Sequence, residues 1–400
     1  MSQSIDVARH AGPVLPWDVA RELAHATGTP LKAVSKPLSD AGGLVLASPL
    51  VSPMAVPPVD RAAMDGYAVC GGGPWRVVQH VGAGCSAPVV LTVGEACSIA
   101  TGAAVPSGAT SVVRDEDAVL VGELLQGPAE PGRHIRRAGE ECQADELLLP
   151  AGVVVDPAVL GLAASVGLNR LTVIPQPRVA AFVTGDELVH RGASGPGRVR
   201  DAIGPMLPGL ITRAGAQAGP VQHLPDSRQA LIEALRSTDA ELILVSGSSA
   251  SGPADHLRPA LAALGAELIV DGVACRPGHP QALARFDDGR LVLGLPGNPL
   301  AALTAFLTLG VAAIRRMRGL SLPALTFAPL PGGVPCHPRS TRLVPVRVTA
   351  QGAVPLGHGG SAMLRGAAAA DALAVIDPGP ASAIAARLLP LDPGAQPWAV

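Results

Sequence analysis

The stretch Ala240–Pro259 reads AELILVSGSSASGPADHLRP. Its apolar, β-branched run from Leu242 to Val245 stops at Ser246-Gly247, a loop of small residues follows, and a helical pattern opens at Asp255. Glycines let a ligand approach the backbone, serines offer hydroxyl groups, and the first N–H groups of a helix favour an anion. We therefore expect a phosphate and metal site at the carboxyl end of this strand, with Asp255 as either an N-cap or a cation ligand.

From Pro177 onwards, strand-like and helical patterns alternate around this stretch. The expected strands are Arg178–Val183, Leu242–Val245, Leu268–Val270 and Leu291–Leu295. The expected helices are Gly204–Arg213, Ser227–Arg236, Ala254–Leu264 and Leu300–Arg318. Alternation of this kind predicts a parallel sheet that is covered by helices on both faces.

The rest of the chain has a different character. Between about Asp60 and Arg133, short apolar runs separated by glycine and proline predict a small β domain. Leu320–Pro338 has five prolines and no periodicity, which predicts a linker, and Arg342 to Leu391 has the strand-like runs of a second small β domain. Four hundred residues are too many for one hydrophobic core, so several domains are expected.

Composition excludes several classes of function. A net charge of −2, without a basic stripe, argues against nucleic-acid binding. The six cysteines show no paired spacing and are expected to be free thiols of a reducing compartment. No apolar signal segment opens the sequence, and Leu291–Ile314, although uncharged, is interrupted by Pro296 to Pro299. We therefore expect a cytoplasmic protein without a membrane span.

Two further strand ends carry polar loops. Thr184-Gly185-Asp186-Glu187 has the spacing of a helix capping box, which competes with a functional interpretation. Leu295-Pro296-Gly297-Asn298-Pro299 is explained structurally by Asn298 as N-cap with proline after it. Arg276-Pro277-Gly278-His279-Pro280 adds a rigid turn and a guanidinium suited to an oxyanion. Several such loops in one sheet favour hard-cation and oxyanion chemistry over covalent catalysis.

Together these segments resemble the MoeA family of molybdopterin molybdenumtransferases, to which the gephyrin E domain is related. The matching segments occur in family order from about residue 15 to 390: Pro57-Pro58-Val59-Asp60, Met64-Asp65-Gly66-Tyr67-Ala68-Val69, Ala100-Thr101-Gly102-Ala103, Ile135-Arg136 to Glu141, Thr184 to Leu188, Ser246-Gly247 with Gly252 and Asp255, Pro277-Gly278, and Leu295 to Pro299.

The resemblance implies an α/β plus β fold of four domains. These are a discontinuous N-terminal domain (1–52 and 140–176), an inserted small β domain (53–139), a three-layer α/β molybdopterin-binding domain with a mixed, mainly parallel sheet (177–322), and a C-terminal β-barrel-like domain (323–400). It also implies a homodimer whose active sites are shared between subunits. Molybdopterin adenylyltransferase and apo-molybdoenzymes are the macromolecular partners that the resemblance suggests.

The implied reaction inserts molybdenum from molybdate into adenylylated molybdopterin, with Mg²⁺, and releases AMP. The implied catalytic residues are Glu187, Asp255, Asp65 and Thr101, of which Glu187 and Asp255 also hold the metal. The implied substrate-binding residues are Arg136, Glu141, Thr184, Asp186, Ser246, Gly247, Ser248, Gly252, Arg276, His279, Pro296, Gly297, Asn298, Arg347 and Ser361.

Some residues depart from the family pattern. Ser248 and Ala250 stand where the loop usually has glycine and serine, His279 replaces a basic residue, Ile203 replaces an amide, and Glu141 stands where aspartate is usual. The altered loop and Ile203 favour an alternative, a non-catalytic carrier of molybdopterin or its cofactor. Retention of Glu187 and Asp255 favours the enzyme, because a carrier does not need both acids.

Overall fold

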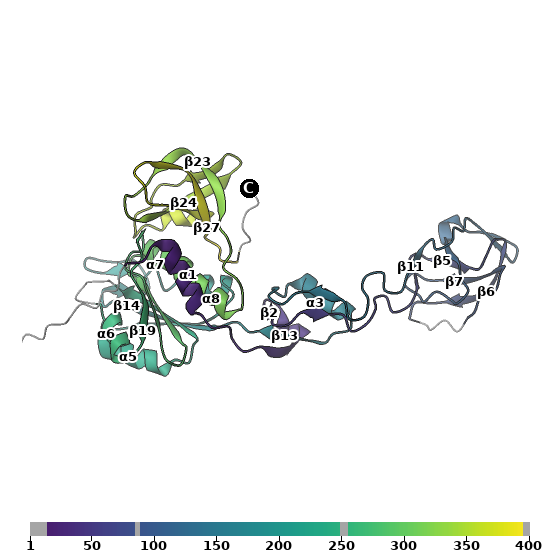
Figure 1. Ribbon diagram of the computed structural model, residues 1–400, viewed down its shortest axis with the longest axis horizontal. Coiled ribbons are helices and arrows are strands. Elements are labelled where there is room, and N and C mark those ends of the chain that lie inside the picture. The colour runs from purple at the N-terminus through teal and green to yellow at the C-terminus, as the bar shows by residue number, and fades with distance from the viewer. Residues whose placement is uncertain (1–13, 85–88, 249–254, 395–400) are drawn as a thin grey trace, which may run out of the picture. The chain divides into compact units, whose positions relative to one another are not determined.

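The computed structural model describes residues 14–84, 89–248 and 255–394 (Figure 1). The chain forms two compact units, each considered by itself below. One unit combines the chain up to Val34 with the chain from Ile174 onwards, and the other is Ser35–Val173.

The first unit contains a six-stranded mixed sheet built around the opening stretch. Its strand order is β17 (Gln217–Leu224), β14 (Arg178–Thr184), β18 (Leu242–Ser248), β22 (Leu291–Pro296), β21 (Ala282–Arg285) and β19 (Glu267–Asp271). The first four strands are parallel, whereas β21 and β19 are antiparallel to their neighbours. The mixed, mainly parallel sheet that the resemblance implied is confirmed: β21 alone runs against the other five strands. The alternating pattern predicted the parallel strands, whereas β17 and β21 were not recognised in the sequence.

Alternate residues of the central strands face two separate cores. Leu242 and Leu244 belong to one apolar cluster and Ile243 to another. The helices on the first face are α1 (Trp17–Thr27), α4 (Leu207–Arg213), α7 (Pro299–Ala305), the π-helical turn η2 (Phe306–Gly310) and α8 (Val311–Met317). The helices on the second face are α5 (Arg228–Ser237) and α6 (Leu257–Ala263). Helices therefore cover both faces, as the alternating pattern predicted (Figure 1).

The long apolar segment after β22 is a core helix. Among the described residues, Pro299–Met317 is the one helix with the length and hydropathy of a membrane span, and 83% of its most apolar window is buried inside the protein. Trp17 of α1 packs against it, and the Trp17 Nε1–H group donates to the Thr308 hydroxyl at 3.0 Å. The expectation of a buried strand followed by a buried helix is confirmed.

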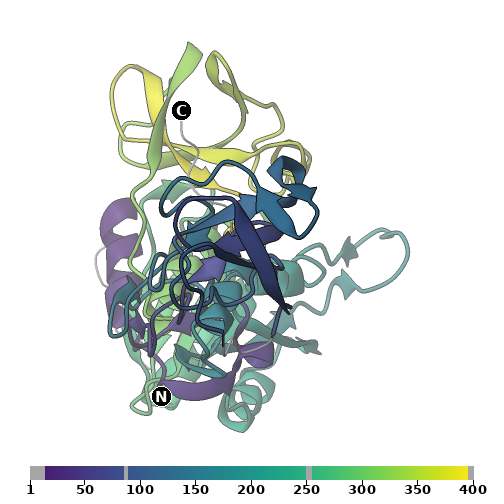
Figure 2. The ribbon, with the colours of Figure 1, turned by 90° about the vertical axis from the view of Figure 1, so that its right-hand side faces the viewer.

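A second sheet forms the C-terminal part of the same unit, and its strands lie together at the top of Figure 2. Its order is β20 (Cys275–Arg276), β24 (Thr341–Thr349), β26 (Ala372–Ile376), β27 (Ser382–Pro390) and β23 (Thr326–Pro335), with β25 (Gly352–Pro355) on β24. The linker expected at Leu320–Pro338 was wrong, because β23 fills most of it. An edge strand tolerates the prolines of β23, since part of its backbone needs no ladder partner.

Ser35–Val173 is rich in short strands, as the sequence predicted. Its six-stranded sheet has the order β8 (Ser111–Arg114), β5 (Gly66–Val69), β7 (Glu95–Ile99), β6 (Trp75–Val81), β10 (Leu124–Gln126) and β9 (Val119–Val121). Three smaller sheets pair β1 (Val34–Pro37) and β2 (Val45–Leu46) with β13 (Arg170–Ile174), β3 (Leu50–Val51) with β12 (Leu147–Leu149), and β4 (Arg61–Ala62) with β11 (Ile135–Arg136).

The remaining elements are short. They are α2 (Leu38–Ala41), the 3₁₀ turn η1 (Asp115–Asp117), α3 (Pro157–Ser165), β15 (Leu188–Val189), β16 (Val199–Arg200) and α9 (Arg365–Ala368). Asp156 caps α3 by accepting the Val159 N–H group at 2.8 Å, as its position before proline predicted. The five cysteines among the described residues are all unpaired, as their spacing predicted.

Candidate functional site

Three of the predicted loops meet at the carboxyl ends of the adjacent strands β14, β18 and β22. The Thr184 hydroxyl donates to the Ser246 carbonyl oxygen at 2.9 Å. Gly247 has a φ of +93°, and a Cβ atom at this position would lie 2.3 Å from Thr184 Oγ1. A Cβ atom at Gly297 would lie 3.7 Å from the Gly247 Cα atom. Only glycine fits at position 247, which lets the three turns pack together.

Asp255 lies on one side of these turns. Together with Thr184, Ser246 and Gly247 it lines a narrow crevice of about 10 Å³. One carboxylate oxygen of Asp255 accepts the Leu257 N–H group at 3.2 Å, and the other contacts Arg258 at 2.8 Å. The carboxylate thus holds the start of α6, which begins at Leu257, one residue later than an N-cap at Asp255 predicted. It already has a cationic partner in Arg258.

Glu187 follows β14 in a turn that leads to β15 rather than to a helix. The capping-box interpretation of Thr184 and Glu187 was therefore wrong. The Glu187 side chain is exposed and is not among the residues that line the Asp255 crevice. Its Oε2 atom lies 3.0 Å from the position of a Cβ atom at Gly185, so the carboxylate is turned back over the end of β14.

Asp226, which sequence reasoning did not single out, joins this group of acids. The Asp186 N–H group donates to Asp226 Oδ2 at 3.1 Å, and the Asp226 N–H group donates to Asp186 Oδ1 at 3.2 Å. This reciprocal pair ties the turn after β14 to the turn after β17. Carboxylate oxygens are the ligands that hard divalent cations prefer, so Asp186 and Asp226 are candidate ligands for such an ion. Among the described residues, these acids are not part of a group of three ligand atoms that lie within 4.8 Å of one another.

A larger cleft of about 900 Å³ adjoins the β22–α7 turn, within the same unit. It is bounded by the β20–β21 loop, the β22–α7 turn and the C-terminal sheet. Five of the predicted substrate-binding residues line it: Arg276, His279, Pro296, Asn298 and Ser361. The parallel pairing of β20 with β24 joins the two sides of the cleft, since it places Arg276 opposite Arg342.

The charge of the larger cleft is positive. Arg276 and Arg342 both line it. Loss of solvation lowers the pKa of the nearby His337, and the positive charges of Arg276, Arg339 and Arg342 lower it further. A cleft with two guanidinium groups fits a phosphate or another oxyanion. Arg342 was missed in the sequence because only the strand register reveals that it faces Arg276.

Asn298 and Ser361 contact each other across this cleft. The Asn298 amide donates to the Ser361 hydroxyl at 3.2 Å, and Ser361 O accepts the Leu300 and Ala301 N–H groups at 2.9 and 3.2 Å. Asn298 occupies the N-cap position of α7, but its side chain makes no capping bond there. The C-terminal sheet domain supplies part of the cap instead, which leaves the Asn298 amide facing the cleft.

The other predicted residues of this unit are placed differently. Arg347 lies on β24 outside the lining of the cleft, and its guanidinium donates to the Ala369 carbonyl oxygen at 2.8 Å. His279 is exposed, and its Nδ1 atom lies 2.9 Å from the Val273 carbonyl oxygen. Gly252 lies outside the described residues, and only the backbone of Ser248, at the end of β18, is described. Ile203 is buried in the core below the sheet.

Four predicted residues belong to the unit Ser35–Val173. Asp65 Oδ1 accepts the Thr101 N–H group at 2.6 Å and the Thr101 hydroxyl at 2.9 Å. These bonds, the backbone one first, hold the pKa of the Asp65 carboxyl below its usual value. Arg136 and Glu141 are exposed, and the Arg136 guanidinium has no hydrogen-bonding partner within the described residues. Asp65 and Thr101 are thus brought together as an exposed, hydrogen-bonded pair.

Comparison with known proteins extends these observations over the whole chain. Residues 15–167 match the model of the MoeA N-terminal region (domains I and II). Residues 180–316 match a probable molybdopterin-binding domain, and residues 328–385 match the MoeA C-terminal region (domain IV).

Individual relatives agree with the domain matches. Molybdopterin molybdenumtransferase 2 of Mycobacterium tuberculosis is 35% identical over 320 residues, which cover 73% of this chain and 77% of the relative. Molybdopterin molybdenumtransferase of Synechococcus elongatus is 34% identical over 358 residues, covering 83% and 89%. The crystal structure of a molybdopterin biosynthesis MoeA protein from Pyrococcus horikoshii superposes with a TM-score of 0.79 at 27% identity, covering 95% of this chain and 99% of that one.

The matched segments carry the converging turns, the acids beside them and the cationic cleft. On this sequence identity and coverage, the chain belongs to the MoeA family.

Proposed function

We propose that this chain is a molybdopterin molybdenumtransferase, which inserts molybdenum from molybdate into adenylylated molybdopterin and releases AMP. The observation that carries the proposal is the arrangement of two cavities around the turns after β14, β18 and β22. One is bordered by the Asp255 carboxylate, and the other by the guanidinium groups of Arg276 and Arg342. The names of the relatives in Mycobacterium tuberculosis and Synechococcus elongatus support it.

The larger cleft is our proposed site for the anionic groups of the substrates. Arg276 and Arg342 supply two fixed positive charges, and Asn298 and Ser361 supply hydrogen bonds at the amino end of α7. Guanidinium groups bind tetrahedral oxyanions through paired N–H donors, so the cleft suits both phosphate groups and molybdate. The volume of about 900 Å³ is large enough for a nucleotide-sized ligand.

The acidic side is our proposed place for Mg²⁺. Glu187, Asp186 and Asp226 are the proposed oxygen donors there. Asp255 is paired with Arg258, so it would bind the ion while keeping that ion pair. A hard cation bound there neutralises negative charge on a pyrophosphate. The close packing of Gly247 against Thr184 and Gly297 fixes the turns beside which these donors lie.

The remaining features of the resemblance enter as parts of the same proposal. We propose a homodimer in which Asp65, Thr101, Arg136 and Glu141 of one subunit complete the site on the other. We also propose the four-domain division, with its boundaries at 52, 139, 176 and 322 and a barrel-like C-terminal domain.

A cytoplasmic location fits the unpaired cysteines. Molybdopterin adenylyltransferase as supplier and apo-molybdoenzymes as recipients fit the chemistry of the substrate and product.

An AMP-release assay tests the proposal. Purified protein is given adenylylated molybdopterin, molybdate and Mg²⁺, and the product is offered to an apo-molybdoenzyme. We expect AMP release that depends on molybdate, together with activation of the acceptor enzyme. Binding of the pterin without AMP release would instead support the carrier alternative, and absence of pterin binding would contradict both.

A further inference from the structure

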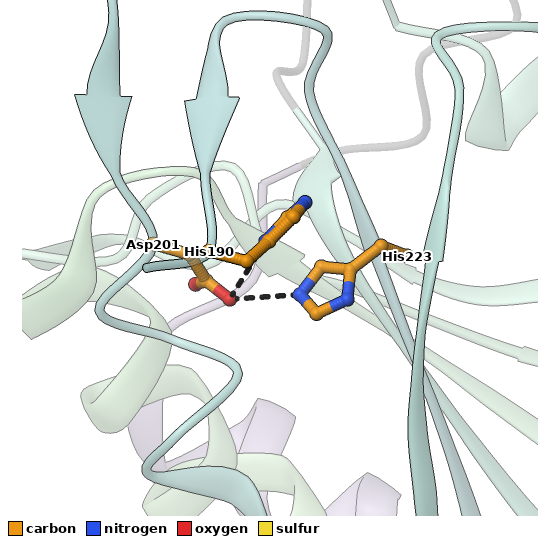
Figure 3. A group of neighbouring side chains, drawn as sticks. All are labelled: His190, Asp201 and His223. Atoms are coloured by element: carbon orange, nitrogen blue, oxygen red, sulfur yellow. Dashed lines mark hydrogen bonds and ion pairs between the residues drawn. The ribbon is translucent and has the colours of Figure 1, made fainter. Parts of the chain in front are cut away.

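Two histidines and an aspartate form a cluster at the β17 edge of the sheet (Figure 3). His190 follows β15, Asp201 follows β16 and His223 lies in β17. Their ligand atoms all lie within 4.8 Å of one another. Asp201 Oδ2 lies 3.0 Å from His223 Nε2 and 4.0 Å from His190 Nδ1.

Burial and backbone hydrogen bonds fix the orientation of the Asp201 carboxylate. Its side chain is 5% exposed, and its other oxygen accepts the Ile203 and Gly204 N–H groups, both at 2.9 Å. Bonds of this kind orient metal ligands in proteins by fixing the oxygen that does not face the ion. Burial opposes ionisation, but the bonds from His223, Gly204 and Ile203 outweigh it, so the pKa of Asp201 lies below its usual value.

The cationic side chains nearby do not occupy this carboxylate. Arg198 and Arg200 donate to the carbonyl oxygens of Asp186 and Val189 instead. Within the described residues, only the two imidazoles reach Asp201 Oδ2, and their ring centroids are 3.6 Å apart. The histidine side chains are 45% and 35% exposed, so an ion has access from solvent.

We propose that His190, Asp201 and His223 bind one divalent transition-metal ion of the Zn²⁺ class. Tetrahedral zinc with bonds of about 2.0 Å places its ligands roughly 3.3 Å apart, a spacing bracketed by the two observed distances. Two imidazoles and one carboxylate favour Zn²⁺ or Co²⁺ over Mg²⁺, which prefers oxygen ligands and retains its water. This site therefore takes a different ion from the acids beside β14.

The bound ion fastens the segment 187–201 to the edge of the sheet. This segment is the teal loop with two short strands that projects to the right in Figure 2. Its two ends are joined by the Val199 N–H bond to the Glu187 carbonyl oxygen at 2.9 Å and by the Asp201 N–H bond to the Val189 carbonyl oxygen at 3.0 Å. The site thereby fixes the backbone of Glu187, and this consequence for catalysis, unlike the metal site itself, rests on the proposed function.

Titration of the chelator-treated full chain with Co²⁺ tests the site without any turnover. We expect one equivalent to bind with the visible absorption of tetrahedral Co²⁺, to persist in excess Mg²⁺ and to be displaced by Zn²⁺. His190→Ala, His223→Ala and Asp201→Asn should each weaken binding at least ~10-fold. His80→Ala, which removes an exposed histidine of β6, serves as the matched control and should leave binding unchanged.

Two results would overturn the proposal. One is Co²⁺ uptake that the three substitutions do not weaken, which would indicate adventitious binding only. The other is the absence of Co²⁺ binding by the wild-type chain when circular dichroism shows that the chain is folded. Hydrogen exchange tests the fastening role separately: Zn²⁺ should slow exchange in 187–201 of the wild-type chain and not of His190→Ala, and equal exchange with and without Zn²⁺ would contradict that role. Failure of AMP release leaves all these readouts intact, so the two proposals fail separately.

Discussion

At the scale of single residues, the site depends on positions whose surroundings require one particular residue type. Gly247 is such a position, because both its φ of +93° and the nearby Thr184 hydroxyl exclude a Cβ atom. Asp65 is another, since one of its oxygens takes both hydrogen bonds of Thr101. These properties give two predictions.

Replacement of Gly247 by alanine should destabilise the first unit more than an equivalent change elsewhere. Gly289 has a φ of +89° but nothing within 4 Å of its Cβ position, so Gly289→Ala carries the backbone cost alone, about 1–2 kcal/mol. Gly247→Ala adds a clash worth about 1–3 kcal/mol. Urea unfolding of the two variants measures the difference, and equal midpoints would show that the turns do not pack as closely as described.

The carboxyl of Asp65 should titrate below its usual pKa. The Thr101 N–H group contributes first and the hydroxyl second, so Thr101→Val should raise this pKa only part of the way back. Because the folded-state pKa is lowered, the stabilisation by ionised Asp65 is present above the unfolded-state pKa and is lost as the pH falls through the folded-state pKa. Carboxyl-detected NMR measures both values, and a wild-type pKa at or above about 3.9 would contradict the bonding described.

Sequence reasoning at this scale succeeded where one segment carried the information. Ser246, Gly247 and Asp255 all lie in the opening stretch, and the structure places them along one crevice. Sequence reasoning missed Arg342, Asp226 and the cluster of His190, Asp201 and His223. The positions of these residues relative to the site depend on which strands are neighbours in the sheet. Strand register and sheet order are set by packing of distant segments, and a local pattern does not contain them.

At the scale of elements, the long helix after β22 organises the first unit. The helix Pro299–Met317 runs under the mixed sheet and packs on α1. Its apolar composition predicted burial correctly, whereas the tertiary contact with α1 was not predicted. The strands β17, β21 and β23 were missed for a related reason. The sequences of β17 and β23 contain polar residues or proline, and β21 has only four residues, so pairing with neighbouring strands rather than local propensity stabilises them.

The contact between α1 and this helix should be a major source of stability. Trp17 is 1% exposed, and Trp17→Ala should cost about 3–5 kcal/mol. Trp17→Phe should cost less, roughly 1–3 kcal/mol, since it keeps the apolar ring but leaves the buried Thr308 hydroxyl without the indole donor.

Phe327→Ala is the control for this prediction. Phe327 lies on β23 with 66% of its surface exposed, so its removal should change stability by about 0.5 kcal/mol or less. Urea unfolding monitored by far-ultraviolet circular dichroism compares the three variants. A loss for Trp17→Ala no larger than that for Phe327→Ala would contradict the packing of α1.

At the scale of the whole molecule, the two compact units carry different parts of the proposed machinery. Glu187, Asp255 and the cationic cleft belong to one unit, while Asp65, Thr101 and Arg136 belong to the other. The MoeA membership was recognisable from the order of short segments along the entire chain. We propose that the two groups of residues meet across a dimer, so that each complete site uses one unit from each subunit.

Mixing two inactive variants tests this central claim most directly. The Asp65→Ala and Glu187→Ala variants should each still form homodimers, and neither should release AMP from adenylylated molybdopterin. When the two chains are unfolded together and reassembled in equal amounts, half of the dimers are mixed and each contains one intact site, so about a quarter of wild-type AMP release should return. No recovery, with mixed dimers demonstrated by mass spectrometry, would contradict a site shared between subunits.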